Sequence, residues 1–558
     1  MLRNRSFCSH PVAKQNGPEA VWWDAAGADI EASVRHGSAT LLKPADTEHA
    51  TRTLAGLPRR IHEVIDRYAA ETPDCLALSE EGNEWSYEKL HRSVGEIAEG
   101  LRALGVRAGD RMMIVSENCV ALVGLLLAAS RIDAWAIVVN PRLSARELDQ
   151  IRDHSGSRRA FLTIAISKEA EAHATRYGAE TRVIGPLADI GVTALNEDTA
   201  PEPVEPSAKD QVVVLIYTSG TTGTPKGVML THENLLFSAK TTADIRRMTP
   251  EDKQYIVLPI SHIVGISLLV MTLMTGAKVR LVSKYDPAGL VKAIAEEGIT
   301  ILNGVPATYQ RLLEYKAIAG LKALNRGSLR LIAVAGAPLD LDLKSRVQQE
   351  LGLSLLNGYG ITECSPGLSG VRIDAPRNDQ AVGPLLPGIE AKIVGTDGSI
   401  KPAGEVGELH VRGRNVMRGY YRAPDLTAKA IDPDGWFNTG DLARFEGDCL
   451  FIVDRTKEMI IRSGFNVYPA EIEAVLSTHP SVVQCAVVGR PIEGNEEVVA
   501  FVQLLSGTAT SVDDLMTHVS PQLTSYKRPS EIIVLPALPA TSTGKILKHK
   551  LAESLRGQ

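Results

Sequence analysis

The chain has 558 residues, of which 44% are apolar and 23% are charged, and its formal net charge is -6. One hydrophobic core rarely serves a chain of this length, so we expect at least two domains. The acidic balance argues against a protein that binds nucleic acid, because such proteins usually carry a basic excess or stripe.

Residues 1–55 show weak periodicity, and we expect them to form an extension of unknown role, mobile or loosely packed. The first helices are expected at Ile61–Ala70 and at Ser86–Leu104. In the second, apolar residues recur at spacings of three and four, Ser86 is in the place of an N-cap, and Gly105 follows the end.

Short apolar runs then alternate with helical stretches, which predicts βα units and a largely parallel sheet that is buried on both faces. The expected strands are 112–115, 135–139, 212–216, 255–259, 278–282, 299–302 and 331–334, and the expected helices include 120–130 and 144–154. A block with its own strands and helices follows Arg455. We therefore predict an α/β protein with a large N-terminal domain at 56–455 and a small, mobile α+β domain at 456–558.

The sequence carries no signal for secretion or for a membrane span. Its basic start, MLRNRSFCSHPVAKQ, lacks an apolar core, and the longest apolar run, at 120–130, is too short to cross a bilayer. The cysteines lie far apart without a CxxC pair, which predicts reduced thiols and a cytoplasmic protein. They are Cys8, Cys75, Cys119, Cys364, Cys449 and Cys485.

A loop rich in glycine and threonine, YTSGTTGTPKG, spans 217–227 directly after the apolar run 212–216. Its glycines allow the backbone to approach a ligand, its hydroxyl groups can donate hydrogen bonds, and Lys226 adds a positive charge. The loop differs from the nucleotide loop of kinases and GTPases, because Pro225 and Gly227 flank the lysine. A flexible surface loop is the alternative, but this string favours a polyphosphate site.

The loop resembles the signature of the adenylate-forming enzymes, which include acyl-CoA and aryl-CoA synthetases, luciferases and the adenylation domains of nonribosomal peptide synthesis. The resemblance covers about 57–552 and includes the strings NGYGITE at 357–363, WFNTGD at 436–441 and DRTKEMIIRSGF at 454–465. It implies that ATP and Mg²⁺ are bound and that coenzyme A is a co-substrate.

The resemblance assigns the ATP site residue by residue. Tyr359 would stack on adenine, Asn357 would bind the amino edge of adenine, and Asp441 with Arg455 would hold the ribose. Glu363 and Thr218 would hold Mg²⁺, the hard cation that prefers such oxygen ligands. The remaining expected contacts to ATP are Ser219, Gly220, Thr221, Thr222, Gly223, Lys226, Gly336, Ala337, Pro338, Gly358, Gly360, Thr362 and Lys545.

The small domain would contribute three residues by resemblance. Lys545, in TSTGKI, would reach the acid's carboxylate and the α-phosphate and act electrostatically. Lys457 would be the hinge on which the small domain turns, and Gly464 would leave room for the pantetheine arm of coenzyme A. Judged without the resemblance, Lys545 is one of several lysines near a solvated helix.

His262 matches the histidine that the acyl- and aryl-CoA branch places beside the substrate carboxylate, although a core histidine is the simpler interpretation. No acidic residue occurs between Tyr255 and Lys284, which favours a simple carboxylic acid over an amino acid. The acyl site is expected to be apolar and to take an aromatic ring or a fatty chain. By family position it is lined by His262, Val264, Gly265, Gly304, Val305, Gly336, Gly358 and Pro366.

These residues predict an AMP-forming acid–CoA ligase, with Lys545, His262, Thr218 and Glu363 as its catalytic groups. Cys364 has no neighbouring base in the sequence and is expected to be packed rather than reactive. Two alternatives stay open: an enzyme that loads an acyl group onto a carrier protein, and a nucleotide-binding homologue without catalysis. The partners would be small molecules and no nucleic acid, and the sequence is compatible with a homodimer.

Overall fold

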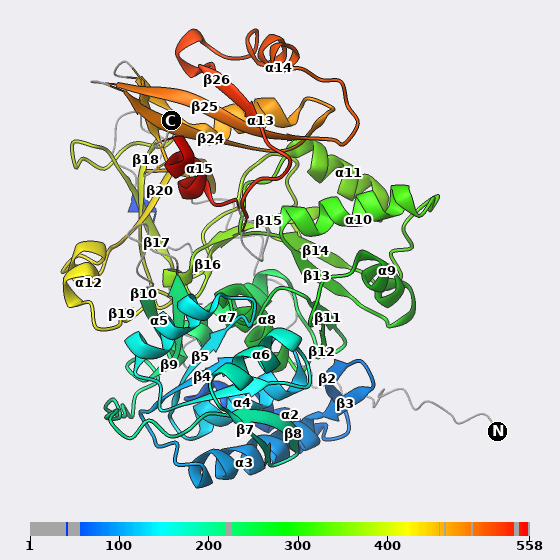
Figure 1. The fold of residues 1–558 in the computed structure, drawn as a ribbon, viewed down its shortest axis with the longest axis vertical. Coiled ribbons are helices and arrows are strands. Elements are labelled where there is room, and N and C mark those ends of the chain that lie inside the picture. Colours follow the sequence, from blue (N-terminus) through cyan, green and yellow to red (C-terminus); the bar gives the residue numbers. More distant parts are fainter. Residues whose placement is uncertain are drawn as a thin grey trace, which may run out of the picture.

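The computed structural model describes residues 41–42, 56–218, 226–456, 458–462, 465–492, 495–540 and 546–555. Two eight-stranded sheets form the bulk of the chain (Figure 1). The strands of the first are β4 (Arg111–Val115), β5 (Trp135–Val139), β6 (Arg159–Thr163), β7 (Glu180–Ile184), β8 (Leu187–Val192), β9 (Val212–Thr218), β10 (Lys226–Thr231) and β19 (Gly419–Tyr420). Those of the second are β2 (Leu76–Glu80), β3 (Asn83–Ser86), β11 (Lys253–Ile256), β12 (Lys278–Leu281), β13 (Ile301–Gly304), β14 (Leu331–Val334), β15 (Leu355–Gly360) and β16 (Gly367–Gly370).

The order of strands is β19-β10-β9-β5-β4-β6-β8-β7 in the first sheet and β16-β15-β14-β13-β11-β12-β2-β3 in the second. The central strands are parallel, as predicted, and antiparallel strands close the edges. Every residue of β4 and β5 is buried, which is why both strands are apolar apart from Arg111 at the start of β4.

The helices confirm the βα alternation. They are α2 (Asp66–Glu71), α3 (Tyr87–Ala103), α4 (Val120–Arg131), α5 (Ala145–Ser155), α6 (Lys168–Arg176), α7 (His232–Ile245), α8 (Ile263–Met274), α9 (Pro287–Glu296), α10 (Pro306–Ile318), α11 (Leu341–Leu351), α12 (Pro424–Ala430), α13 (Pro469–Ser477), α14 (Val512–Val519) and α15 (Lys548–Ser554), with short 3-10 turns η2 (Ile61–Ile65), η3 (Thr362–Cys364) and η4 (Ser525–Lys527). Buried residues of α3, α4, α7 and α8 join strands of both sheets in one core. None of the described helices is long and apolar enough to span a membrane.

One expected helix begins at its predicted N-cap, and another is divided into two shorter helices. The Ser86 hydroxyl accepts a hydrogen bond from the backbone N–H of Lys89 at 3.2 Å, so Ser86 is the N-cap of α3 as predicted. The helix expected at 61–70 is divided into η2 and α2. Ile61 and Val64 are both buried at a spacing of three, which suits the tighter 3-10 turn.

A five-stranded antiparallel sheet is formed mostly by 390–455, directly before the small C-terminal part. Its strands are β1 (Leu41–Leu42), β17 (Glu390–Val394), β18 (Gly407–Arg412), β20 (Phe437–Glu446) and β21 (Cys449–Arg455), in the order β1-β17-β18-β20-β21. Leu41 and Leu42 belong to the expected N-terminal extension and pair with β17. The other residues of 1–55 lie outside those described.

The small C-terminal part lies at one end of the molecule, beyond α11 (orange to red in Figure 1). Its strands are β22 (Ile460–Arg462), β23 (Phe465–Val467), β24 (Val482–Ile492), β25 (Asn495–Leu504) and β26 (Glu531–Val534), and among the described strands they pair only with one another. Successive residues of β24 face two separate cores, one with α13 and α14 and the other with α15. A mixed α/β chain with a large N-terminal and a small C-terminal domain is therefore confirmed.

Candidate active site

Three residues of the expected adenosine site meet between two sheets. Asp441 on β20 lies opposite Arg455 on β21, and the Arg455 Nε is 3.2 Å from Asp441 Oδ1. Tyr359 on β15 donates its hydroxyl hydrogen to Asp441 Oδ2. The Asp441 side chain is 5% exposed whereas that of Arg455 is 47% exposed. The structure thus assembles a shielded carboxylate that one tyrosine and one arginine hold in place.

The electrostatics of this group keep the tyrosine protonated. Burial raises the pKa of Tyr359 well above its ordinary value, and the neighbouring Asp441 carboxylate raises it further. The phenol therefore remains a hydrogen-bond donor at neutral pH. A carboxylate has about four acceptor positions, so Asp441 can hold both neighbours and still accept hydrogen bonds from a ligand.

The turn at the end of β15 is held by hydrogen bonds of the Asn357 side chain and by close backbone packing at Gly360. The side-chain nitrogen Nδ2 of Asn357 donates to the carbonyl oxygen of Ala381 at 3.3 Å, and the side-chain oxygen Oδ1 of Asn357 accepts from the N–H of Gly358 at 3.1 Å. A Cβ on Gly360 would lie 2.2 Å from the carbonyl oxygen of Pro366, so only glycine fits there. The half-buried Thr362 follows this turn.

The segment 336–338 is exposed and follows β14, which pairs in parallel with β15. Since parallel neighbours end at the same edge of a sheet, Gly336, Ala337 and Pro338 lie on the same side as the turn that carries Tyr359. Gly336 has a φ of +87°, a backbone conformation that favours glycine. This is the edge at which open α/β sheets bind ligands.

The phosphate end of the expected site lies between β9 and β10. Thr218 pairs with Lys226 across these strands, and the Lys226 Nζ lies 5.3 Å from the ring centre of Tyr420. The Tyr420 hydroxyl donates to Glu363 Oε1 at 3.0 Å. These contacts link the loop's lysine to the expected metal ligand. Ser219, Gly220, Thr221, Thr222 and Gly223 lie outside the described residues.

Tyr420 is a site residue that the sequence did not reveal. Its segment is tied to both sides of the site: Met417 N donates to Glu363 O at 2.8 Å, and Tyr421 N donates to Gly227 O at 2.8 Å. Burial and the nearby Glu363 carboxylate raise the pKa of Tyr420, which keeps its hydroxyl a donor. The pair of adjacent tyrosines at 420 and 421 is the sequence feature that could have indicated Tyr420, but it lies outside the strings that resemble the family's motifs.

Glu363 and Thr218 suit a magnesium ion by their chemistry. Glu363 is half-buried, and among the described residues its second oxygen, Oε2, has no partner. A carboxylate and a hydroxyl are hard oxygen ligands, and Mg²⁺ commonly takes only one or two protein ligands beside substrate phosphates. The described part of the chain contains no group of three or more His, Cys, Asp and Glu side chains that could hold a metal without a substrate. Cys364, next to Glu363, is fully buried and burial raises its pKa, so its thiol is unreactive.

His262 precedes α8 and occupies its N-cap position. Its side chain is exposed, yet the surrounding protein lowers its pKa. The imidazole is therefore neutral at pH 7 and accessible. A Cβ on Gly265 would lie 2.3 Å from the carbonyl oxygen of Pro259, so the first turn of α8 requires glycine for packing.

The other expected acyl-site residues border the ends of β13, β14 and β15. Val305 is the N-cap of α10, and a Cβ on Gly336 would lie 3.6 Å from its Cγ1. Pro366 follows a cis peptide bond and is half-buried, as is Val264. The missing side chain of Gly304 would point at Thr308 and Tyr309 of α10, and that of Gly358 would point at the carbonyl of Ser369.

Lys457, Gly464 and Lys545 lie outside the described residues, but the structure describes their flanks. The backbones of Ala540 and Ile546 form a β-bridge on either side of 541–545. Lys548, at the start of α15, places its Nζ 2.9 Å from Glu458 and 2.8 Å from Glu473. Lys548, three residues after Lys545 in the chain, is thus held beside Glu458, the residue that follows Lys457.

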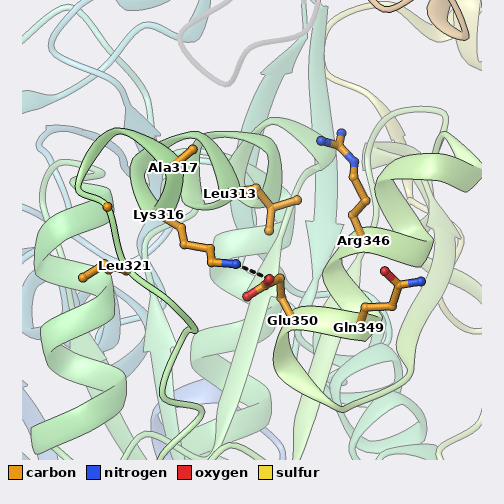
Figure 2. Close-up of a pocket in the computed structure, with 8 residues that line it drawn as sticks. Leu313, Lys316, Ala317, Leu321, Arg346, Gln349 and Glu350 are labelled. Atoms are coloured by element: carbon orange, nitrogen blue, oxygen red, sulfur yellow. Dashed lines mark hydrogen bonds and ion pairs between the residues drawn. The ribbon is translucent and has the colours of Figure 1, made fainter.

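A cleft of about 470 Å³ lies elsewhere, between α10 and α11 (Figure 2). An ion pair between Lys316 and Glu350 crosses it. It contains none of the expected site residues, and we assign it no role in the reaction.

Comparisons with known proteins show the family to which the chain belongs. Residues 65–421 match the model of the AMP-binding enzyme family, and 471–545 match its C-terminal domain. A feruloyl-CoA synthase from Amycolatopsis sp. is 35% identical over 491 residues, covering 87% of this chain and 97% of that protein. The long-chain-fatty-acid–CoA ligase FadD13 from Mycobacterium tuberculosis is 31% identical over 473 residues, covering 84% and 92%.

Solved structures are similar over the same span. ATP-bound MatB from Rhodopseudomonas palustris has a TM-score of 0.78 and 31% identity, covering 88% of this chain and 98% of that one. The o-succinylbenzoate–CoA synthetase MenE from Bacillus subtilis, in complex with ATP and a magnesium ion, has a TM-score of 0.75 and 28% identity, covering 88% and 99%.

Proposed function

The chain belongs to the AMP-binding enzyme family and is an AMP-forming acid–CoA ligase, and from this premise we propose how its residues perform the two half-reactions. The observation that carries the proposal is the convergence of Tyr359, Asp441 and Arg455 beside the Glu363–Tyr420–Lys226 group. The group of Tyr359, Asp441 and Arg455 suits a nucleoside. The group of Glu363, Tyr420 and Lys226 suits a polyphosphate with its cation.

In the first half-reaction the acid's carboxylate attacks the α-phosphorus of ATP, and pyrophosphate leaves. Asp441 and Arg455 hold the ribose, Tyr359 stacks on adenine, and the loop at 218–226 donates hydrogen bonds to the phosphates. Lys545 stabilises the negative charge that develops between carboxylate and α-phosphate. Bound at Glu363 and Thr218, Mg²⁺ supplies positive charge against the phosphate oxygens.

His262 is proposed to orient the acid's carboxylate. Because its pKa is lowered, the imidazole is neutral at pH 7 and can donate a hydrogen bond through its N–H group. A neutral donor orients the carboxylate without the strong charge pairing that would make it a poorer nucleophile. The charge needed in the transition state comes from Lys545 instead.

In the second half-reaction the thiol of coenzyme A attacks the acyl carbonyl, and AMP leaves. We propose that rotation at Lys457 exchanges Lys545 for the pantetheine arm, which passes the side-chain-free position of Gly464. We propose that the boundary between the domains lies between 455 and 456; β21 ends at Arg455, and the first strand of the small part, β22, begins at Ile460.

The proposed acid has an apolar body, aromatic or fatty, because Val264 and Val305 border the site with bare glycine backbone at 304 and 336. The acceptor is proposed to be free coenzyme A, as the names of the feruloyl-CoA and fatty-acyl-CoA relatives indicate for those proteins. Among the described cysteines, Cys119, Cys364, Cys449 and Cys485 are buried free thiols, which supports a cytoplasmic location.

The test is product analysis with ATP, magnesium and a panel of fatty, benzoic, phenylacetic and cinnamic acids, with and without coenzyme A. We expect acid-dependent release of pyrophosphate and AMP, and thioester formation once coenzyme A is present. ADP and orthophosphate as products would refute the proposal. Adenylate that accumulates without turnover on coenzyme A would instead support a carrier protein as acceptor.

A further inference from the structure

Arg246 carries a guanidinium group that forms no ion pair with the described residues. It follows α7 as the C-cap residue, and its side chain is half-buried. Burial lowers its pKa to about 10, and no carboxylate of the described residues forms an ion pair with it. The arginines near it are paired: Arg247 with Asp374 at 2.8 Å, and Arg330 with Asp252 at 2.7 Å. Removing a charge from water without a partner is costly, so this exception calls for an explanation.

Asn303 is the one hydrogen-bond partner that the structure gives the Arg246 side chain among the described residues. The Arg246 Nη1 donates to Asn303 Oδ1 at 2.7 Å. The amide cannot be turned around, because arginine has no acceptor for an N–H group. Asn303 is 4% exposed, and its Nδ2 lacks any partner in the described part of the chain. The half-buried Arg246 and the buried Asn303 therefore offer further hydrogen-bond donors, while the one side-chain acceptor between them, Asn303 Oδ1, is already used, and burial of unmade donors is unfavourable.

Asn303 and Arg246 are linked to the expected acyl site through Gly304 and through α7. Asn303 directly precedes Gly304, whose missing side chain would point at α10. Because side chains alternate along a strand, Asn303 points to the opposite face of the sheet, toward α7. Ile301 and Ala333 on that face belong to an apolar cluster, so the environment of Asn303 is poorly solvated.

One face of α7 connects Pro366 with Arg246. Ser238, Thr242 and Arg246 recur every four residues and so share that face. Ser238 Oγ accepts from the N–H of Gly367 at 3.2 Å, and Gly367 follows Pro366. Arg246 comes eight residues after Ser238, about 12 Å further along a helix that rises 1.5 Å per residue.

We propose that Arg246 and Asn303 form a subsite for a second carboxylate, at the end of the acid opposite the carboxylate that is activated. The inference rests on the proposed function and narrows its substrate to an acid with an apolar body and an anionic far end. A carboxylate accepts from the guanidinium fork and from the Asn303 amide at once, and it neutralises the buried charge. A methyl group would do neither, and a hydroxyl group would leave the charge in place.

The test compares kcat/KM for pyrophosphate release between matched acids. Straight-chain dicarboxylic acids of graded length are paired with monocarboxylic acids of equal length, and cinnamic acids carry a para carboxylate, hydroxyl or methyl group. The wild type should prefer the best dicarboxylic acid over its methyl-ended match by at least about tenfold. Arg246→Met should lower kcat/KM for that acid by about 100-fold and change the value for the match by less than about threefold. Arg247→Met is the control, because it removes a neighbouring arginine whose partner is on the surface.

Asn303→Asp separates recognition from folding. It keeps the side-chain volume and supplies the counter-charge within the protein, so the variant should be at least as stable as the wild type and should lose the preference for dicarboxylic acids. A wild-type preference for the methyl or hydroxyl acids, or equal losses for both members of a pair in Arg246→Met, overturns the inference while the proposed function stands. No pyrophosphate with any acid refutes the proposed function itself.

Discussion

The replacement Asp441→Asn tests the proposed ribose site. Asp441 is almost fully buried, so its hydrogen bonds are weakly screened. An amide offers one acceptor oxygen in place of two, and it carries no charge. Hydrogen bonds to a charged group contribute about 1.5–3 kcal/mol each. With about 1.4 kcal/mol per tenfold change, loss of one such bond to the ribose should raise the KM for ATP by about 10- to 100-fold.

The fold should tolerate this change. The asparagine oxygen can face Arg455, which only donates, while its NH₂ group faces Tyr359, whose hydroxyl oxygen can accept. We therefore expect the melting temperature to change by only a few degrees. The KM for the acid should stay near the wild-type value, because the ribose contact is remote from the acyl group.

The assay is initial-rate pyrophosphate release at saturating acid with ATP varied. Asp425→Asn is the matched control, since Asp425 is an exposed residue in the first turn of α12 and should leave the KM for ATP unchanged. A folded Asp441→Asn enzyme with a wild-type KM for ATP would refute the assignment of Asp441 to the nucleotide.

Three further outcomes are expected. Glu363→Gln should raise the magnesium concentration for half-maximal activity at least about tenfold, and unchanged metal dependence would remove Glu363 from the ion site. Lys545→Ala should slow adenylation at least about 100-fold, which corresponds to ~2.7 kcal/mol of transition-state stabilisation. Thioester formation from preformed adenylate should be much less affected. Equal losses in both steps would contradict the proposed role of Lys545. Burial lowers the pKa of His62 to about 4, below its ordinary value of 6.5. Between pH 6.5 and 4 the His62 imidazole is protonated in the unfolded chain but neutral in the folded protein. The contribution of His62 to the free energy of unfolding is therefore greatest above pH 6.5 and falls by about 3 kcal/mol as the pH drops to 4. Denaturant unfolding across this range should show the slope, and His62→Gln should flatten it; an identical slope in the variant would assign it to other groups.

The parts of the fold that were predictable are those in which local pattern and tertiary burial agree. The strands β4 and β5 are apolar, apart from Arg111 at the start of β4, because they are buried on both faces. The antiparallel sheet that contains β17, β18, β20 and β21 was not predicted, because its strands mix polar with apolar residues. In β18, for example, buried residues alternate with partly exposed ones that include Glu408 and Arg412.

The site divides in the same way. Tyr359, Asp441 and Arg455 stand in strings that resemble the family's motifs, so the sequence alone could name them. Arg246 and Asn303 are 57 residues apart and stand in no string. Only the packing of α7 on the sheet brings them together, so their relation could not be read from the sequence.

The end of β21 connects nucleotide binding to the small domain. Arg455 reaches back to Asp441, whereas the preceding Asp454 accepts a hydrogen bond from the N–H of Ala470, in the first turn of α13, at 3.1 Å. The rotation proposed at Lys457 would leave the contact between Arg455 and Asp441 intact, because both residues precede Lys457 in the chain. It would break the contact between Asp454 and Ala470, because these residues lie on opposite sides of Lys457. Under this proposal the nucleotide would stay at the proposed ribose site while the small domain turns, as two successive half-reactions on one adenylate require.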